Sequence, residues 1–350
     1  MYKKSFITCT LFAALLAAAP AAQARQARPS KRIAVLAFKN LRPNTDTDWI
    51  GAGAAETLTT KLAAVPGLVA IERSQVRQLA QEKGFQESDL ADPKGAAKAG
   101  KLLGAERVVL GTYAADGDAL IFNVRVVDVQ TGAILSAAAV TGSKTKIFDT
   151  LFQLADAVVK SFDNTVVIVD NRPTVRPAPQ GDRIALTAEQ KTQLRKPDTT
   201  SRQAYEAYAR AAAADPDDKL RWTTRAIGFD PKFTAAYRRR AQAYAAKGQH
   251  EKAIADCNKA IADTPGQAEA YRTRGLVYLQ QDRNGRAVKD FNKAIELAPS
   301  DAAAYFYRAM ARYRKKEYRK AWNDMTAARE LGHTIPPAFE TALERALARH

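Results

Sequence analysis

The sequence predicts two architectures in series: an α/β sandwich with a mixed sheet and helices, then an all-α solenoid of helical hairpins. Two observations predict them. Short apolar runs alternate with helical patterns over residues 32–142. In the last third of the chain, single residues recur at an interval of 34 residues. Such a period indicates stacked copies of a unit that cannot bury its apolar face alone.

The composition is that of a globular protein with several domains. The chain has 350 residues, of which 46% are hydrophobic, enough for each domain to bury a core. Its formal net charge of +17 favours acidic partners. The alternative is a solvated basic surface that only keeps the protein soluble. No nucleic-acid-binding motif is visible, so nucleic acid is not an expected partner.

The first residues have the pattern of a signal peptide. Lys3 and Lys4 precede an apolar run over residues 6–19, and Ala22-Gln23-Ala24 supplies a small-x-small cleavage site. The run is shorter than the roughly 20 residues needed to span a bilayer. We therefore expect residues 1–24 to be cleaved after Ala24, and the mature protein to be periplasmic, without a transmembrane span.

Cysteine usage predicts no intramolecular disulfide. Cys9 would leave with the signal peptide, so Cys257 would be the single remaining thiol. Cys257 falls at a core position of the repeats described below, which predicts a buried, inert thiol.

The first domain, residues 30–163, is predicted element by element from apolar runs and their boundaries. Pro66-Gly67 ends the first helix, and Gly84 ends the second. The turns Asp116-Gly117-Asp118 and Gln130-Thr131-Gly132 join the last three strands into an antiparallel meander. The expected strands are 32–38, 68–71, 107–113, 119–129 and 133–140, and the expected helices are 49–64, 74–83, 93–103 and 146–162.

These segments resemble the TolB amino-terminal-like and CsgG-like domains of bacterial envelope proteins. The motifs that carry the resemblance lie at residues 33–40, 49–53, 68–74, 102–111 and 126–132. The resemblance implies a periplasmic domain that docks onto other envelope components and has no catalytic residues. The chain lacks the β-propeller of TolB and the membrane hairpins of CsgG, so their specific functions are not expected here.

One glycine-rich fragment, Gly51-Ala52-Gly53, could suggest a phosphate-binding loop. A dinucleotide fingerprint needs its glycines directly after a strand, and a third glycine where Glu56 stands. We therefore interpret the fragment as the entry to a helix.

Residues 164–200 are predicted to be a linker between the two folded parts. An edge strand is expected at 165–169, and Pro173, Pro177, Pro179 and Gly181 then favour a semi-extended chain. We expect the two parts to move relative to each other.

The last part, residues 201–350, resembles the tetratricopeptide repeats. Each unit is predicted to hold two helices and a turn, and a shortened copy precedes three regular ones. A cap over residues 337–349 would close the array. The residues that recur are Pro231, Pro265 and Pro299; Tyr237, Tyr271 and Tyr305; Ala253, Ala287 and Ala321; and Ala260, Ala294 and Ala328.

One arginine and one aspartate also recur in every unit. They are Arg240, Arg274 and Arg308, and Asp256, Asp290 and Asp324. The structural interpretation is an ion pair within each repeat, which we favour because a guanidinium pairs well with a carboxylate across a helical hairpin. The functional alternative is an anion-binding stripe.

The tetratricopeptide resemblance implies a peptide-binding groove on the first helix of each repeat. Arginines beside apolar and aromatic positions there suit an acidic and hydrophobic protein segment. Gln242 replaces the asparagine of the carboxylate-clamp pattern, so that pattern is not reproduced. A basic cluster at residues 312–320 is interpreted as solvated. The groove positions are Arg238, Gln242, Arg272, Leu276, Phe306, Met310 and Tyr313.

No residues at catalytic or metal-ligand spacing are found, so we expect no enzyme activity, cofactor or metal. The favoured function is a non-catalytic periplasmic scaffold that binds protein or peptide partners through the repeats. Its α/β domain would dock to an envelope complex. The alternative is a module that senses a small molecule or glycan in the α/β cleft.

Overall fold

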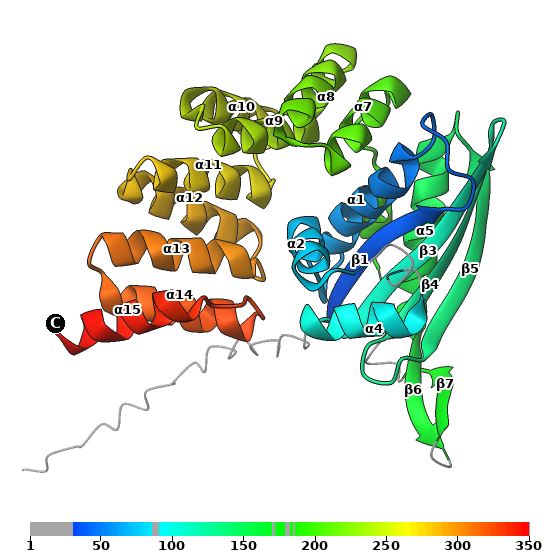
Figure 1. Cartoon of the computed structure of the whole chain (residues 1–350), viewed down its shortest axis with the longest axis horizontal. Coiled ribbons are helices and arrows are strands. Elements are labelled where there is room, and N and C mark those ends of the chain that lie inside the picture. The colour runs from blue at the N-terminus through cyan, green and yellow to red at the C-terminus, as the bar shows by residue number, and fades with distance from the viewer. Residues whose placement is uncertain are drawn as a thin grey trace, which may run out of the picture.

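The structure is a computed structural model that describes residues 31–85, 90, 92–169, 172–178, 183–184 and 186–349. The predicted signal peptide and its cleavage site lie outside these residues. Figure 1 shows a sheet with its helices, and an arc of helices that begins beside α1 (Trp49–Ala63) and ends in α15 (Pro337–Ala348). No helix in the described part combines the length and apolar character that crossing a membrane requires.

A five-stranded mixed sheet organises the first domain, with strand order β2-β1-β3-β4-β5. β1 runs parallel to β2 and β3, whereas β3, β4 and β5 form the predicted antiparallel meander. Both meander turns contain a glycine with positive φ, Gly117 at 53° and Gly132 at 71°. The strands are β1 (Lys31–Asn40), β2 (Leu68–Ala70), β3 (Arg107–Asp116), β4 (Ala119–Asp128) and β5 (Ile134–Ser143).

Helices cover both faces of this sheet. Ile33 and Val35 of β1 join the core formed with α1 and α5 (Ile147–Lys160). Ala34 and Leu36 join the core on the opposite face, formed with α2 (Arg73–Lys83) and α4 (Pro93–Leu102). Because strand side chains alternate between faces, a strand buried on both sides has an uninterrupted apolar sequence.

The two glycines at the start of α1 permit close packing. A Cβ added to Gly51 would lie 2.2 Å from the carbonyl oxygen of Phe38 in β1. A Cβ added to Gly53 would lie 2.7 Å from the Cβ of Ala209 in α7 (Arg202–Ala213). The fragment lies in the first turns of a helix, as interpreted from the sequence, and its glycines bring α1 close to the sheet and to the repeats.

The segment between the two parts contains more secondary structure than a linker would. Asn164–Val169 (β6) pairs antiparallel with Arg172–Pro177 (β7), and Ala188–Arg195 forms α6. Leu194 of α6 is 3% exposed and joins the core of the α/β domain. The prolines of β7 are tolerated because, among the described residues, this strand pairs on one side only.

The remaining helices form hairpins that stack in order, which confirms the predicted solenoid. The turns between the two helices of successive repeats have left-handed residues at the same interval: Gly248, Asp282 and Lys316, with φ of 70°, 56° and 61°. The further helices are α8 (Pro216–Phe229), α9 (Thr234–Ala246), α10 (His250–Asp263), α11 (Ala268–Gln280), α12 (Asn284–Leu297), α13 (Ala302–Arg314) and α14 (Tyr318–Glu330).

Candidate functional site

The inner surface of the repeats faces the α/β domain. Figure 1 shows the arc of repeats curving around α2. Two arginines on the first helices of their repeats form ion pairs with the α/β domain. Arg239 of α9 forms an ion pair of 2.5 Å with Glu56 of α1. Arg272 of α11 pairs with Glu72, which directly precedes α2. The candidate protein-binding surface is therefore also an interface within the chain.

Both predicted groove arginines are buried, and both bind carboxylates. Arg238 is 5% exposed and lies 3.0 Å from a carboxylate oxygen of Glu269 in α11. Arg272 is 7% exposed and lies 3.1 Å from Asp301, which precedes α13, besides its pair with Glu72. Each arginine thus links its repeat to the next one.

The apolar groove positions divide into two groups. Phe306 stacks on His333, with ring centroids 4.5 Å apart, and also contacts Phe339 of α15. Tyr313 contacts Phe339 as well, at 5.7 Å between centroids. These two positions therefore support the cap helix. Leu276 and Met310 are half-buried beside the core around Phe291, and Gln242 is exposed.

Burial and charge act in opposite directions on Glu56. Burial by itself raises the pKa of this carboxyl, but the surrounding guanidinium groups outweigh it and hold the pKa below its ordinary value. Those groups belong to Arg239, Arg73, Arg77 and Arg238. Burial likewise lowers the pKa of Arg272, but Asp301, Glu72 and Glu269 together raise it above its ordinary value. The interface is thus held in its charged form.

Sequence reasoning missed Arg239 and Glu56. Arg239 breaks the repeat pattern, because Thr273 and Tyr307 stand at the equivalent positions of the next two repeats. Glu56 directly follows the buried Ala54 and Ala55 of α1, and its side chain is 16% exposed. Two signals could have indicated this contact between the two domains. One is a charged residue beside buried positions of α1, and the other is an arginine of α9 outside the periodic pattern of the repeats.

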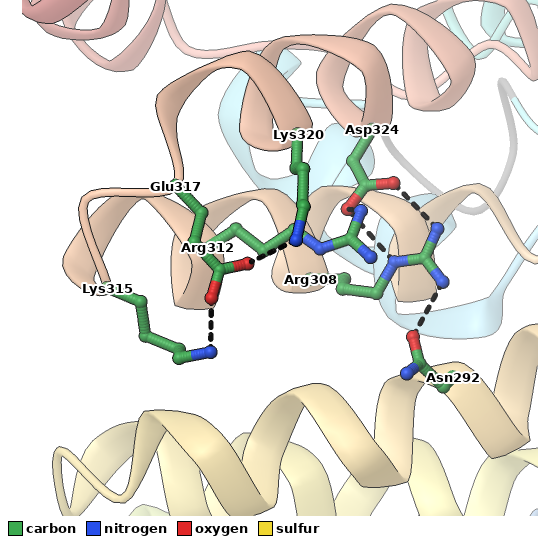
Figure 2. Close-up of polar contacts among 7 residues, drawn as sticks. All are labelled: Asn292, Arg308, Arg312, Lys315, Glu317, Lys320 and Asp324. Atoms are coloured by element: carbon green, nitrogen blue, oxygen red, sulfur yellow. Dashed lines mark hydrogen bonds and ion pairs between the residues drawn. The ribbon is translucent and has the colours of Figure 1, made fainter. Parts of the chain in front are cut away.

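The periodic arginines and aspartates pair within each repeat, which confirms the structural interpretation. In each repeat, Nε and Nη2 of the arginine donate to the two carboxylate oxygens of the aspartate. The distances are 2.7 and 2.8 Å for Arg240 with Asp256, 2.8 and 2.7 Å for Arg274 with Asp290, and 2.9 and 2.6 Å for Arg308 with Asp324. Figure 2 shows that Arg308 also donates to Asn292 of the preceding repeat, at 2.8 Å. The column of ion pairs therefore joins neighbouring repeats.

Much of the basic cluster near the end of α13 is ion-paired. Arg312 binds Asp324 at 2.7 Å, and Lys315 and Lys320 both bind Glu317 (Figure 2). Arg314 binds Asp282 at 2.7 Å. These contacts lie within the repeats and reduce the charge that the cluster offers to a partner.

Cys257 and the potential metal ligands form no site in the part of the chain that the structure describes. Cys257 is fully buried, as predicted, and burial raises the pKa of its thiol to about 12. Among the described residues, no three His, Cys, Asp or Glu side chains are grouped so that they could hold a metal ion.

Two family models each match a part of the chain. Residues 241–312 match the tetratricopeptide repeat, so this part of the predicted resemblance is confirmed. Residues 10–146 match the family described as FlgO protein. This family is neither TolB nor CsgG, so the resemblance of the first domain to those two proteins stays a prediction. No curated protein matches the chain.

Solved structures resemble parts of the chain, among them a tetratricopeptide repeat domain. The second repeat domain of Spaghetti (RPAP3), bound to an HSP90 peptide, is 26% identical; the match covers 28% of this chain and 91% of that one, with a TM-score of 0.28. MamA is 22% identical, with coverages of 41% and 84% and a TM-score of 0.35. PilF of Pseudomonas aeruginosa is 17% identical, with coverages of 42% and 67% and a TM-score of 0.36.

Proposed function

We propose that the chain is a non-catalytic scaffold of the bacterial periplasm. Its tetratricopeptide repeats bind a protein segment, and its α/β domain docks to an envelope complex. The observation that carries the proposal is the inner surface of the repeats, where half-buried apolar side chains adjoin arginines that bind carboxylates. Buried arginines and apolar anchors of this kind contribute most of the affinity in protein interfaces.

The periplasmic part of the proposal rests on the amino-terminal sequence. The basic start, the apolar run and Ala22-Gln23-Ala24 together favour export. Cell fractionation and amino-terminal sequencing of the mature protein test it. Recovery from the cytoplasm with Met1 retained would contradict it.

Crosslinking in intact cells, followed by mass spectrometry, tests partner binding. Gln242→Glu combined with Leu276→Glu places two carboxylates on the groove without removing a buried arginine. We expect this variant to lose the captured partner. Lys289→Glu is the matched control, because Lys289 is exposed on α12, the second helix of its repeat. An unchanged set of captured proteins in the groove variant would argue against the repeats as the binding surface.

The absence of catalysis is part of this proposal. A hydrolase screen on the purified protein tests it, and turnover that scales with protein concentration would contradict it.

A groove between β5 and α5 favours a second function, the sensing of a small molecule. Its volume is about 360 Å³, within the range of ligand sites. Gln153, Asp156 and Lys160 supply polar groups, although Asp156 already pairs with Arg195 at 2.6 Å. A thermal-shift screen with Lys160→Ala as the comparison would distinguish this function. By contrast, the cavity at the junction of α1, α5 and α7 measures about 20 Å³, room for about one water.

A further inference from the structure

Two kinds of contact hold the repeats against the α/β domain, and they lie at different places along the arc. At α7 an apolar cluster dominates the contact, beside hydrogen bonds from Arg77 to Ala212 and from Arg210 to Thr45. Tyr205 packs against Trp49 and Phe148, with ring centroids 6.0 and 5.2 Å apart, and it belongs to the core of the α/β domain. Its hydroxyl group makes a hydrogen bond of 2.8 Å with Thr57. This end of the solenoid is part of the first domain's packing.

Further along the arc, polar contacts join the two parts. We call the three described here the latch: Arg239 with Glu56, Arg272 with Glu72, and Arg32 with the backbone of α14's end. In the last of these, the Arg32 guanidinium donates to the carbonyl oxygens of Leu331 and Gly332. Replacing Glu72, whose side chain is partly exposed, by another carboxylate keeps Arg272 paired and costs little, whereas the Arg239–Glu56 pair is buried and costs more to separate.

The middle contact of the latch is open to exchange. The side chain of Glu72 is 37% exposed, whereas that of Arg272 is 9% exposed and that of Asp301 is 14% exposed. Solvent therefore reaches Glu72, the carboxylate of the α/β domain, more easily than Asp301, the carboxylate of the repeats that also binds Arg272. A carboxylate from another chain can replace Glu72 while Asp301 keeps Arg272 in position.

We infer that the α/β domain occupies the partner-binding surface of its own repeats, and that an acidic protein segment binds there by displacing Glu72 from Arg272. Binding then opens the latch, while the apolar contact at α7 acts as the pivot. The inference rests on the proposed function, because it names the chemistry of the partner and the state of the groove before the partner arrives.

The charge of the interface supports an acidic occupant. Arg73, Arg77 and Lys219 approach the same region as Arg239, and the carboxylates that act on this group are Glu56 and Asp215. Arg73 donates to the carbonyl oxygen of Val35 at 2.6 Å, and Arg77 to that of Ala212 at 2.9 Å, so both charges are held by backbone groups. Burial lowers the pKa of Lys219, and the nearby charges of Arg77 and Arg239 lower it further. Added carboxylates would relieve this repulsion.

The test measures binding of a short oligoglutamate peptide to the full chain, with oligoglutamine as the control peptide. Glu72→Gln removes the internal competitor and raises the fraction of the open state, so we expect it to tighten oligoglutamate binding by about fivefold or more. Arg272→Gln should abolish binding. Arg329→Gln is the matched control, because Arg329 pairs with Glu340 at 2.5 Å outside the latch, and it should leave the affinity unchanged.

Opening itself is measured in the unmodified chain by small-angle X-ray scattering. Oligoglutamate should increase the radius of gyration, and oligoglutamine should not. Weaker or unchanged oligoglutamate binding by Glu72→Gln, or no expansion of the wild-type chain, would overturn the inference. Neither result depends on the partner captured in cells. Partner capture could fail while oligoglutamate opens the latch, and the converse could also occur, so the two proposals fail separately.

Discussion

The two ends of the contact between the repeats and the α/β domain differ in chemistry. At α7, Tyr205 and Ala209 join the same apolar core as β1, α1 and α5. At the latch, arginines meet carboxylates and backbone carbonyl groups. Salt screens a partly exposed ion pair such as that of Glu72, whereas the apolar contact has no charges to screen. The comparison shows how one chain can have a fixed end and an exchangeable end on the same surface.

The largest effect on the free energy of unfolding is expected when the apolar contact at α7 is removed. Tyr205→Ala should lower the free energy of unfolding by about 3–5 kcal/mol, because it leaves a cavity between Trp49 and Phe148. Urea-induced unfolding measures this. Tyr205→Phe is the control and loses only the hydrogen bond to Thr57, worth about 1 kcal/mol. Equal losses of unfolding free energy for the two variants would mean that packing of the Tyr205 ring does not stabilise the contact at α7.

Buried ion pairs within the repeats provide the second contrast, with the partly exposed Glu72 contact of the latch. Asp324 is 3% exposed and accepts from both Arg308 and Arg312. Asp324→Asn should therefore cost about 3 kcal/mol. High salt should not reproduce that loss.

Glu340→Gln is the less buried comparison for Asp324→Asn, because the Glu340 side chain is 31% exposed, and it should cost less than about 1 kcal/mol. Sulfate should raise the melting temperature of the Asp324→Asn variant by no more than that of the wild type, because its exclusion from the protein surface stabilises both. A larger shift in the variant would favour the anion-binding interpretation of the arginine column.

Acidification should weaken the latch through Glu56. Its pKa in the folded chain lies below the ordinary value, so the unfolded chain binds the proton more readily. The stabilisation is therefore fully present above the ordinary pKa of about 4.3 and is lost as pH falls through the lower folded value. Unfolding free energies measured across this range should fall less steeply for Glu56→Gln than for the wild type.

The matched control for Glu56 is Glu344→Gln. Glu344 is exposed on α15, far in sequence from the latch. This variant should keep the acid-induced loss of the wild type, and a loss equal in all three proteins would mean that Glu56 does not carry it.

The smallest effect is expected on the rate at which a thiol reagent labels Cys257. This rate distinguishes opening of the latch from unfolding of the repeats. Its thiol is buried and protonated at neutral pH, so a thiol reagent should react slowly. Because opening of the latch leaves the core of the repeats intact, the labelling rate should be the same for Glu72→Gln and the wild type. Fast labelling of Glu72→Gln without denaturant would show that this variant unfolds its repeats.

Local sequence patterns predicted most of the secondary structure. The 34-residue interval located the helical hairpins, and the turns at Gly117 and Gly132 located the meander. The pairs such as Arg308 with Asp324 were predicted because both partners recur within one repeat. The segment 164–200 was harder, since its prolines suggested a linker whereas β7 accommodates Pro173 and Pro177 in a two-stranded hairpin.

The sequence by itself determined which elements form and how each repeat is built, because propensity, turn chemistry and periodicity act over short distances along the chain. Only the tertiary structure decided that the groove arginines face the α/β domain. Glu72 and Arg272 lie 200 positions apart, and no periodic pattern connects them. Their meeting depends on the curvature of the whole solenoid and on the packing of α7 against α1, which arise from many contacts together.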